Sequence, residues 1–305
     1  MSTPRFRLLE SVGVGVCVVG IASYAVAVGY RKDQTLQLAS YNDELFAYPE
    51  ILETDLAGDF IVVDYRESRD IDERDEVVER LVKPLYVSLD VLEMQRDLVV
   101  ETPAGPVRHF AVGRVEGATI VVVYFHGQGG SRHQGVDDLT FGGNFNRIKN
   151  LMAANGGLYL SPDFSDFGRV GAREMAGLVI HYAQASPRAR VFLACGSQGG
   201  MICWQLAKDR DVAAIISGLL FLGSMHDDDF LQSAAGQRRI PVFFGHGGAD
   251  RVFPVSKQEA FFRTLRRSVP DYPARFVRFE TGTHGTPIRM IDWRDALNWM
   301  LSIES

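Results

Sequence analysis

Residues 190–207 have the sequence RVFLACGSQGGMICWQLA, and this stretch decides the fold. The apolar run Arg190–Cys195 is typical of a buried strand, and the run from Met201 onward is typical of a helix. Ser197 lies in the glycine-rich turn between them. A serine among small residues at such a turn is the nucleophile-elbow pattern, because strand and helix approach closely only where side chains are small. We therefore predict that Ser197 is a nucleophile facing helical N–H groups that would stabilise negative charge.

Similar apolar runs recur along the chain and are separated by segments of helix length. Strands that alternate with helices form right-handed βαβ units, so this order predicts a mostly parallel central sheet flanked by helices. Two strand-like stretches, 97–101 and 107–112, give the sheet an antiparallel start. Ligands of such sheets bind at the carboxyl ends of the strands. The other expected strands are 119–125, 157–161, 213–222, 240–245 and 276–279.

Three further glycine-rich segments follow expected strands, and each contains histidine. Residues 126–130 (HGQGG) follow strand 119–125, and residues 246–254 (HGGADRVFP) follow strand 240–245. Residues 281–285 (TGTHG) follow the last strand and precede a helix expected over 292–303. The carboxyl ends of parallel strands meet at one edge of a sheet, so these segments should lie near Ser197.

On these residues the chain resembles the α/β-hydrolase family over residues 93–303. The family's elbow pattern is G-x-S-x-G, and this sequence has CGSQG, with Cys195 in place of the first glycine. The chain order Ser197, Asp250, His284 also matches the order expected for this fold. The resemblance implies the α/β-hydrolase fold and gives each motif a role. Asp250 would be the acid and His284 the base of a triad with Ser197. The oxyanion hole would use the backbone N–H groups of Gln128 and Gln198, in a loop with His126, Gly127 and Gly129.

Two alternatives remain open for parts of this site. Asp227, Asp228 and Asp229 follow an earlier strand end and are a rival position for the acid. Residues 126–130 also read as a phosphate-binding loop, although they lack the Lys-Ser/Thr that ends a P-loop. The other histidines have no metal-ligand spacing, and His126 and His246 are expected to brace their loops. We expect no metal and no cofactor.

Composition narrows the possibilities further. The chain has 305 residues, of which 46% are hydrophobic, enough for one large domain with a continuous core. Its net charge of −6 argues against a nucleic-acid partner, which would require a basic face. Cys17, Cys195 and Cys203 form no CxxC pair, and we interpret Cys195 and Cys203 as small buried residues.

The amino-terminal residues predict a membrane segment. Residues 11–30 are uncharged and lie between Arg5 and Arg7 on one side and Arg31 and Lys32 on the other. Twenty helical residues span about 30 Å, the thickness of a bilayer core. This is a retained signal anchor or a cleaved signal peptide, with 25–27 (AVA) as the cleavage site. We favour the anchor because the apolar run is longer than the core of a usual signal peptide. The catalytic domain would then lie outside the cytoplasm. The alternative is secretion after cleavage.

Three regions follow from these patterns. Residues 1–32 are the anchor or signal segment, 33–92 a polar extension and 93–305 the catalytic domain. Within the extension, 60–65 (FIVVDY) is expected to be a strand. Residues 66–83 are expected to be an exposed helix with the i,i+4 charge pairs Asp70–Arg74 and Glu76–Arg80. Only about residues 223–239 lie between two late strands, which leaves no room for a large cap domain.

The expected function is hydrolysis of carboxylic esters through an acyl-enzyme. Small-molecule or oligomeric esters would be the substrates. Residues 126–131 (HGQGGS) also resemble the polyester-depolymerase and feruloyl-esterase branch of the family. A prolyl-oligopeptidase-like peptidase shares the elbow, and an acyltransferase or thioesterase would use the same triad. A non-catalytic ligand-binding relative is disfavoured because Ser197, Asp250 and His284 are all present.

Overall fold

The computed structural model describes Met1 and residues 36–303. A ten-stranded sheet forms the centre of the fold. The strand order is β1-β2-β12-β11-β10-β9-β7-β8-β6-β5. Neighbours from β2 to β8 in this order are parallel, and antiparallel pairs occur at both edges. This confirms the mostly parallel sheet expected from the sequence. The strands are β1 Ile51–Asp55, β2 Phe60–Val63, β5 Gln95–Thr102, β6 Gly105–Gly113, β7 Ile120–Phe125, β8 Leu158–Pro162, β9 Arg190–Gly196, β10 Ile216–Leu222, β11 Val242–Gly247 and β12 Ala274–Phe279.

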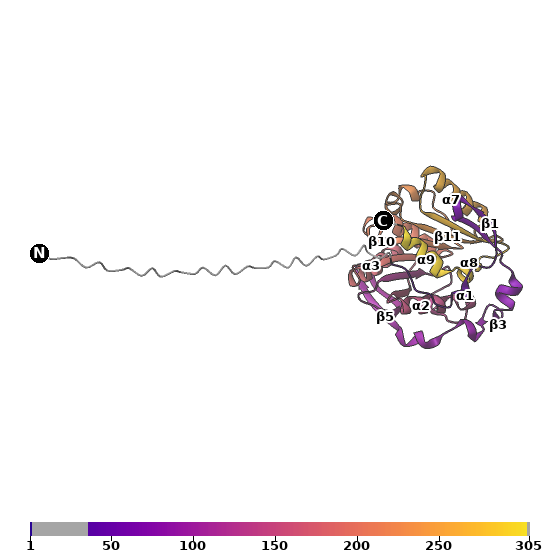
Figure 1. The fold of residues 1–305 in the computed structure, drawn as a ribbon, viewed down its shortest axis with the longest axis horizontal. Helices are drawn as coiled ribbons and strands as arrows, with labels where there is room; N and C mark the ends of the chain where they lie inside the picture. The colour runs from indigo at the N-terminus through magenta and orange to yellow at the C-terminus, as the bar shows by residue number, and fades with distance from the viewer. Residues whose placement is uncertain (2–35, 304–305) are drawn as a thin grey trace. The chain divides into compact units, whose positions relative to one another are not determined.

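Helices cover both faces of the sheet (Figure 1). In β7 every residue is buried, and successive side chains enter two different apolar cores because strand residues alternate between faces. One core receives side chains from α3 Arg169–Ala185, α4 Gly199–Lys208, α5 Arg210–Ile215, α6 Ala234–Gln237 and α7 Val255–Ser268. The other receives them from α2 Asn144–Ala154, α8 Thr286–Met290 and α9 Trp293–Ser302. A short helix, α1 Asp43–Phe46, precedes β1.

The polar extension 33–92 contributes to this sheet. β2 corresponds to the strand expected over 60–65, and it lies parallel to β12, with Phe60 opposite Phe276. β1 pairs antiparallel with β2 and forms the edge. The sheet therefore begins well before residue 93, and β2 completes the side of the sheet next to the last strand.

The prediction of an exposed helix over 66–83 is wrong. This stretch forms a π-helical turn, Ser68–Asp72, and a two-stranded hairpin, β3 Asp75–Val77 with β4 Leu81–Val82. The expected Asp70–Arg74 pair is absent, because the Arg74 guanidinium is buried against the rings of Phe46 and Tyr86, with its carbon 4.5 Å from each ring centre. Asp70 instead pairs with Arg69 at 2.7 Å. Tertiary contacts thus override a charge pattern that favours a helix.

The connection between β10 and β11 contains little regular structure. Between β10 and β11 the chain forms only a 3₁₀ turn, Phe230–Gln232, and the four-residue α6. The predicted membrane segment 1–32 lies outside the described residues. Among the residues that are described, no helix combines the length and apolar character needed to cross a bilayer.

Candidate active site

Ser197 occupies a sharp turn between β9 and α4. Its φ is +50°, in the left-handed region that non-glycine residues rarely adopt, as expected for a strained elbow. Gly199 is required here, because a Cβ on it would lie 2.3 Å from the carbonyl oxygen of Phe125 at the end of β7. The close approach of α4 to β7 therefore brings Ser197 beside the loop that follows β7.

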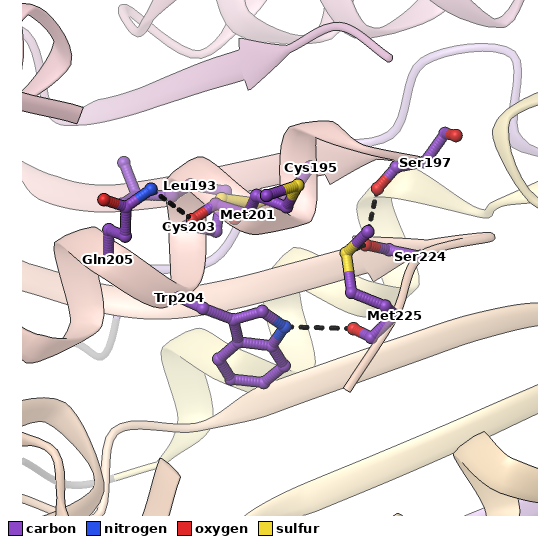
Figure 2. Close-up of a disulfide and its surroundings, with 9 residues drawn as sticks. All are labelled: Leu193, Cys195, Ser197, Met201, Cys203, Trp204, Gln205, Ser224 and Met225. Carbon is purple, nitrogen blue, oxygen red and sulfur yellow. Dashed lines mark hydrogen bonds between the residues drawn. A yellow bond between two sulfur atoms is a disulfide. The ribbon is translucent and has the colours of Figure 1, made fainter. Parts of the chain in front are cut away.

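Cys195 and Cys203 form a disulfide across this turn (Figure 2). The sequence analysis treats them as two separate buried residues; both are buried, but the bond between them corrects that interpretation. Cys195 is near the end of β9 and Cys203 is in α4, with Cα atoms 6.4 Å apart. The disulfide closes a ring that contains Ser197. The cysteine in place of the family's first glycine thus has its side chain directed toward α4.

The structure brings Ser197, His284 and Asp250 together in one hydrogen-bonded chain. Nε2 of His284 lies 2.8 Å from Oγ of Ser197, and Nδ1 lies 2.8 Å from Oδ2 of Asp250. An ionised carboxylate only accepts hydrogen bonds, so Nδ1 carries the proton and Nε2 is left to accept the one from Ser197. This tautomer is the one that a general base for the serine needs.

The environment of Asp250 favours its ionised form. Its side chain is fully buried, and this burial alone would raise its pKa. Hydrogen bonds from His246, His284 and the backbone N–H groups of Phe253 and Val252 outweigh the burial and hold the pKa of Asp250 well below its usual range. The carboxylate is therefore charged at any pH at which the protein would work.

The rival acids lie elsewhere. Asp227 pairs with Lys208 at 2.6 Å, and its other carboxylate oxygen accepts the backbone N–H of Asp229. Asp228 is largely exposed and lies 3.7 Å from His226. Neither arrangement reaches His284, so of the two candidate positions only Asp250 contacts the imidazole.

The loop after β7 lies directly against Ser197. A Cβ on Gly127 would be 2.8 Å from the Cβ of Ser197, so only glycine permits this approach. Nδ1 of His126 bonds to the carbonyl of Gly127 at 2.9 Å, and its ring stacks on Phe164 with centres 4.3 Å apart. Burial lowers the pKa of His126, which favours a neutral ring. His126 thus braces the loop, as the sequence analysis expects.

The backbone N–H groups of Gln128 and Gln198 have no hydrogen-bond acceptor among residues 36–303. Gln198 is the first residue after Ser197 and precedes α4, where N–H groups lack partners within the helix. Gly129, next to Gln128, has φ +74°, which turns the loop. Two donors without partners on the loops that flank Ser197 are available to bind an oxyanion.

One contact at the site goes beyond the sequence analysis. His246, expected only to brace its loop, has Nε2 2.7 Å from the carbonyl oxygen of Phe253 and 3.3 Å from Oδ2 of Asp250. The i,i+4 spacing of His246 and Asp250 was visible in the sequence. It could not indicate a contact, because both residues lie outside a helix, where that spacing carries no geometric meaning.

A cavity of about 290 Å³ adjoins the loop that carries His284. Thr283 and Gly285, which flank His284, line it together with Tyr65, Ile71 and Phe141. Two exposed apolar side chains are close in sequence to the other site residues: Met201 in the first turn of α4 and Val252, two residues after Asp250. Within residues 36–303, no three His, Cys, Asp or Glu side chains are grouped closely enough to bind a metal ion.

No family model matches the sequence, and no curated protein matches it. Several solved structures resemble the described chain. An α/β serine hydrolase without a lid from Xanthomonas campestris is 18% identical, with a TM-score of 0.51, over 68% of this chain and 93% of that one. An esterase from Pyrococcus furiosus is 13% identical, with a TM-score of 0.53, over 70% and 94%. A candidate α/β hydrolase of unknown function from Agrobacterium tumefaciens is 16% identical, with a TM-score of 0.52, over 67% and 93%. At these identities the likeness establishes architecture, and we conclude that the chain has the α/β-hydrolase fold.

Proposed function

We propose that this protein is a serine hydrolase that cleaves carboxylic esters through an acyl-enzyme. The observation that carries the proposal is the continuous hydrogen-bonded chain from Ser197 through His284 to Asp250. The unpartnered N–H groups of Gln128 and Gln198 beside the serine support it. Solved structures of the same fold described as a serine hydrolase and as an esterase are consistent with it.

The proposed reaction uses each of these groups in turn. Oγ of Ser197 attacks the ester carbonyl carbon while Nε2 of His284 takes the hydroxyl proton. The N–H groups of Gln128 and Gln198 stabilise the negative oxygen of the tetrahedral intermediate. His284 then returns the proton to the leaving alcohol as the carbon–oxygen bond breaks, which leaves an acyl-Ser197. A water molecule, deprotonated by His284, attacks this ester, and His284 gives that proton to Oγ of Ser197 as the acid is released.

Three features of the segments that carry the site residues indicate the substrate class. The short β10–β11 segment provides no large cap, so the site admits soluble esters or the ends of longer chains. Met201 and Val252 are 41% and 57% exposed, which would favour an apolar acyl or alcohol group over a charged one. The cavity beside His284 is large enough for a small aromatic or branched group.

A panel of p-nitrophenyl esters of increasing acyl length, measured beside aminoacyl p-nitroanilides, tests the reaction class. We expect hydrolysis of esters at rates well above those of the amides, and none by Ser197→Ala. Preference for the amides would favour a peptidase instead. Addition of hydroxylamine or an alcohol separates hydrolysis from acyl transfer, because an acyltransferase would give mainly the transfer product.

The location of the enzyme is part of the same proposal. Residues 1–32 would anchor it in a membrane, with the catalytic domain outside the cytoplasm. The Cys195–Cys203 disulfide supports an oxidising compartment, because such bonds are rare in the cytosol. Full-length protein should sediment with membranes and a chain that starts at Asp33 should not. Uncleaved full-length protein in the soluble fraction would contradict the anchor.

A further inference from the structure

We infer that His246 is a positioning residue that holds the Asp250 carboxylate for His284, an inference that rests on the proposed serine hydrolase function. His246 is in β11, and its side chain is 2% exposed. It makes no contact with Ser197 and takes no proton from it. Its effect would pass through Asp250, which makes it distinct from the three residues of the hydrogen-bonded chain.

The protonation of the His246 ring follows from its neighbours. Nε2 lies 2.7 Å from the carbonyl oxygen of Phe253 and 3.3 Å from Oδ2 of Asp250. A carbonyl and an ionised carboxylate are both acceptors, so Nε2 carries a proton whatever the state of Nδ1. The stronger bond to Phe253 fixes the plane of the ring. Oδ2 of Asp250 lies within ion-pair distance of the same nitrogen, which the carboxylate attracts through its charge.

The two oxygens of Asp250 are held in different ways. Oδ1 accepts two backbone N–H groups, from Val252 at 2.7 Å and Phe253 at 3.0 Å. Among the described residues, Oδ2 is approached only by side chains: Nδ1 of His284 is hydrogen-bonded to it at 2.8 Å, and Nε2 of His246 lies 3.3 Å from it. Without His246, the single side-chain donor to Oδ2 among the described residues would be the imidazole that must itself be positioned. We therefore expect His246 to hold Oδ2 in place independently of His284.

The backbone next to His246 lies close to the loop that carries His284. Gly247 follows it, and a Cβ there would lie 2.3 Å from the carbonyl oxygen of Thr283 and 2.4 Å from that of Gly282. The end of β11 thus packs directly on the loop that carries His284. Phe253, to which His246 is bonded, also has its ring centre 5.6 Å from that of His284. The strand that contains His246 thus packs on the His284 loop, and the residue bonded to His246 packs near the His284 ring.

A bracing role alone is the competing explanation, since the Phe253 contact could simply hold the loop in place. A double-mutant comparison separates the two, because residues that act through one another are not additive. His246→Leu removes the donor, His246→Gln keeps an N–H near the position of Nε2, and His246→Asn carries the same amide on a shorter side chain. Each is made in the wild-type protein and in Asp250→Asn.

The readout is the second-order rate of fluorophosphonate labelling of Ser197 by intact-mass spectrometry, beside kcat and KM for a p-nitrophenyl ester. His246→Leu should lower the labelling rate and kcat about 10- to 100-fold, the range for a hydrogen bond to a charged group, with little change in KM. His246→Gln should recover most of the loss and His246→Asn should not. In Asp250→Asn the His246→Leu effect should shrink to less than about threefold.

A matched control removes another buried imidazole, one whose hydrogen bonds involve none of the site residues. His109 is fully buried in β6 and bonds through Nε2 to the hydroxyl of Tyr182 at 2.6 Å. His109→Leu should lower Tm without slowing labelling of the folded protein. Should His246→Leu not fold, the comparison of Gln with Asn in both backgrounds gives the same test.

Two failures are distinguishable. An equal loss from His246→Leu with and without Asp250 would show that His246 only braces the loop, and would overturn this inference alone. Wild-type protein that neither reacts with the probe nor hydrolyses any ester would overturn the proposed function, and this inference with it.

Discussion

Replacing Asp250 by asparagine tests the acid assignment sharply, because the structure fixes how the new amide would orient. Oδ1 accepts two backbone N–H groups, so the amide oxygen of the introduced asparagine would take that position and keep both bonds. The NH₂ group would then replace Oδ2 and face Nδ1 of His284. A donor at this place favours the tautomer with the proton on Nε2, which cannot accept the proton of Ser197. Loss of the correct tautomer costs up to about 10⁴-fold in turnover, or about 5.5 kcal/mol of transition-state stabilisation.

The assay is steady-state hydrolysis of a p-nitrophenyl ester by folded variants, with circular dichroism as the check on folding. Asp227→Asn, Asp228→Asn and Asp229→Asn serve as matched controls, since each makes the same chemical change on a solvated loop. These three should change turnover by less than about threefold, because Asp227 pairs with Lys208, Asp228 lies near His226, and Asp229 is exposed, so none of them orients His284. Near-normal turnover of Asp250→Asn together with collapse of one control would refute the reasoning and move the acid to the 227–229 loop.

Three further predictions follow from the geometry. Gly199→Ala should lower kcat by more than about 10-fold, because its Cβ would lie 2.3 Å from the Phe125 carbonyl oxygen and displace the elbow; an unchanged kcat would show that the elbow tolerates the shift. Cys203→Ala should lower the free energy of unfolding by about 2–3 kcal/mol by opening the ring, measured in urea against wild type; superimposable curves would count against a disulfide in the native protein. Folding lowers the pKa of Asp250. The charged carboxylate therefore contributes its full stability at pH values above about 3.9, the pKa in the unfolded chain. This contribution is lost as the pH falls through the lower pKa of the folded protein. The Tm of wild type should therefore rise relative to that of Asp250→Asn between about pH 2 and pH 5, and a constant difference would contradict the lowered pKa.

The sequence predicts the centre of the fold and the candidate site well, for a physical reason. Buried parallel strands need continuous apolar runs, and those of β7, β9 and β11 are unambiguous. Ser197 and Asp250 each follow such a strand closely, and His284 follows the last strand, β12. Parallel strands bring their carboxyl ends together. Their convergence could therefore be inferred without knowledge of any contact.

The parts that the sequence does not predict depend on long-range contacts. Residues 66–83 carry helical charge spacing, but the burial of Arg74 against Phe46 and Tyr86 determines their structure instead. The disulfide depends on which way Cys195 and Cys203 face across the elbow, which no local pattern encodes. The contact of His246 with Asp250 likewise requires the loop between them to fold back, and only the three-dimensional structure shows it.

The most direct test of the central claim is covalent labelling of the full-length protein with a fluorophosphonate probe, measured by intact-mass spectrometry and peptide mapping. The arrangement of Ser197 with His284 predicts one added probe per wild-type molecule, located on Ser197, and no addition to folded Ser197→Ala. Equal labelling of both proteins would mean that another residue reacts, and the proposed nucleophile would be wrong.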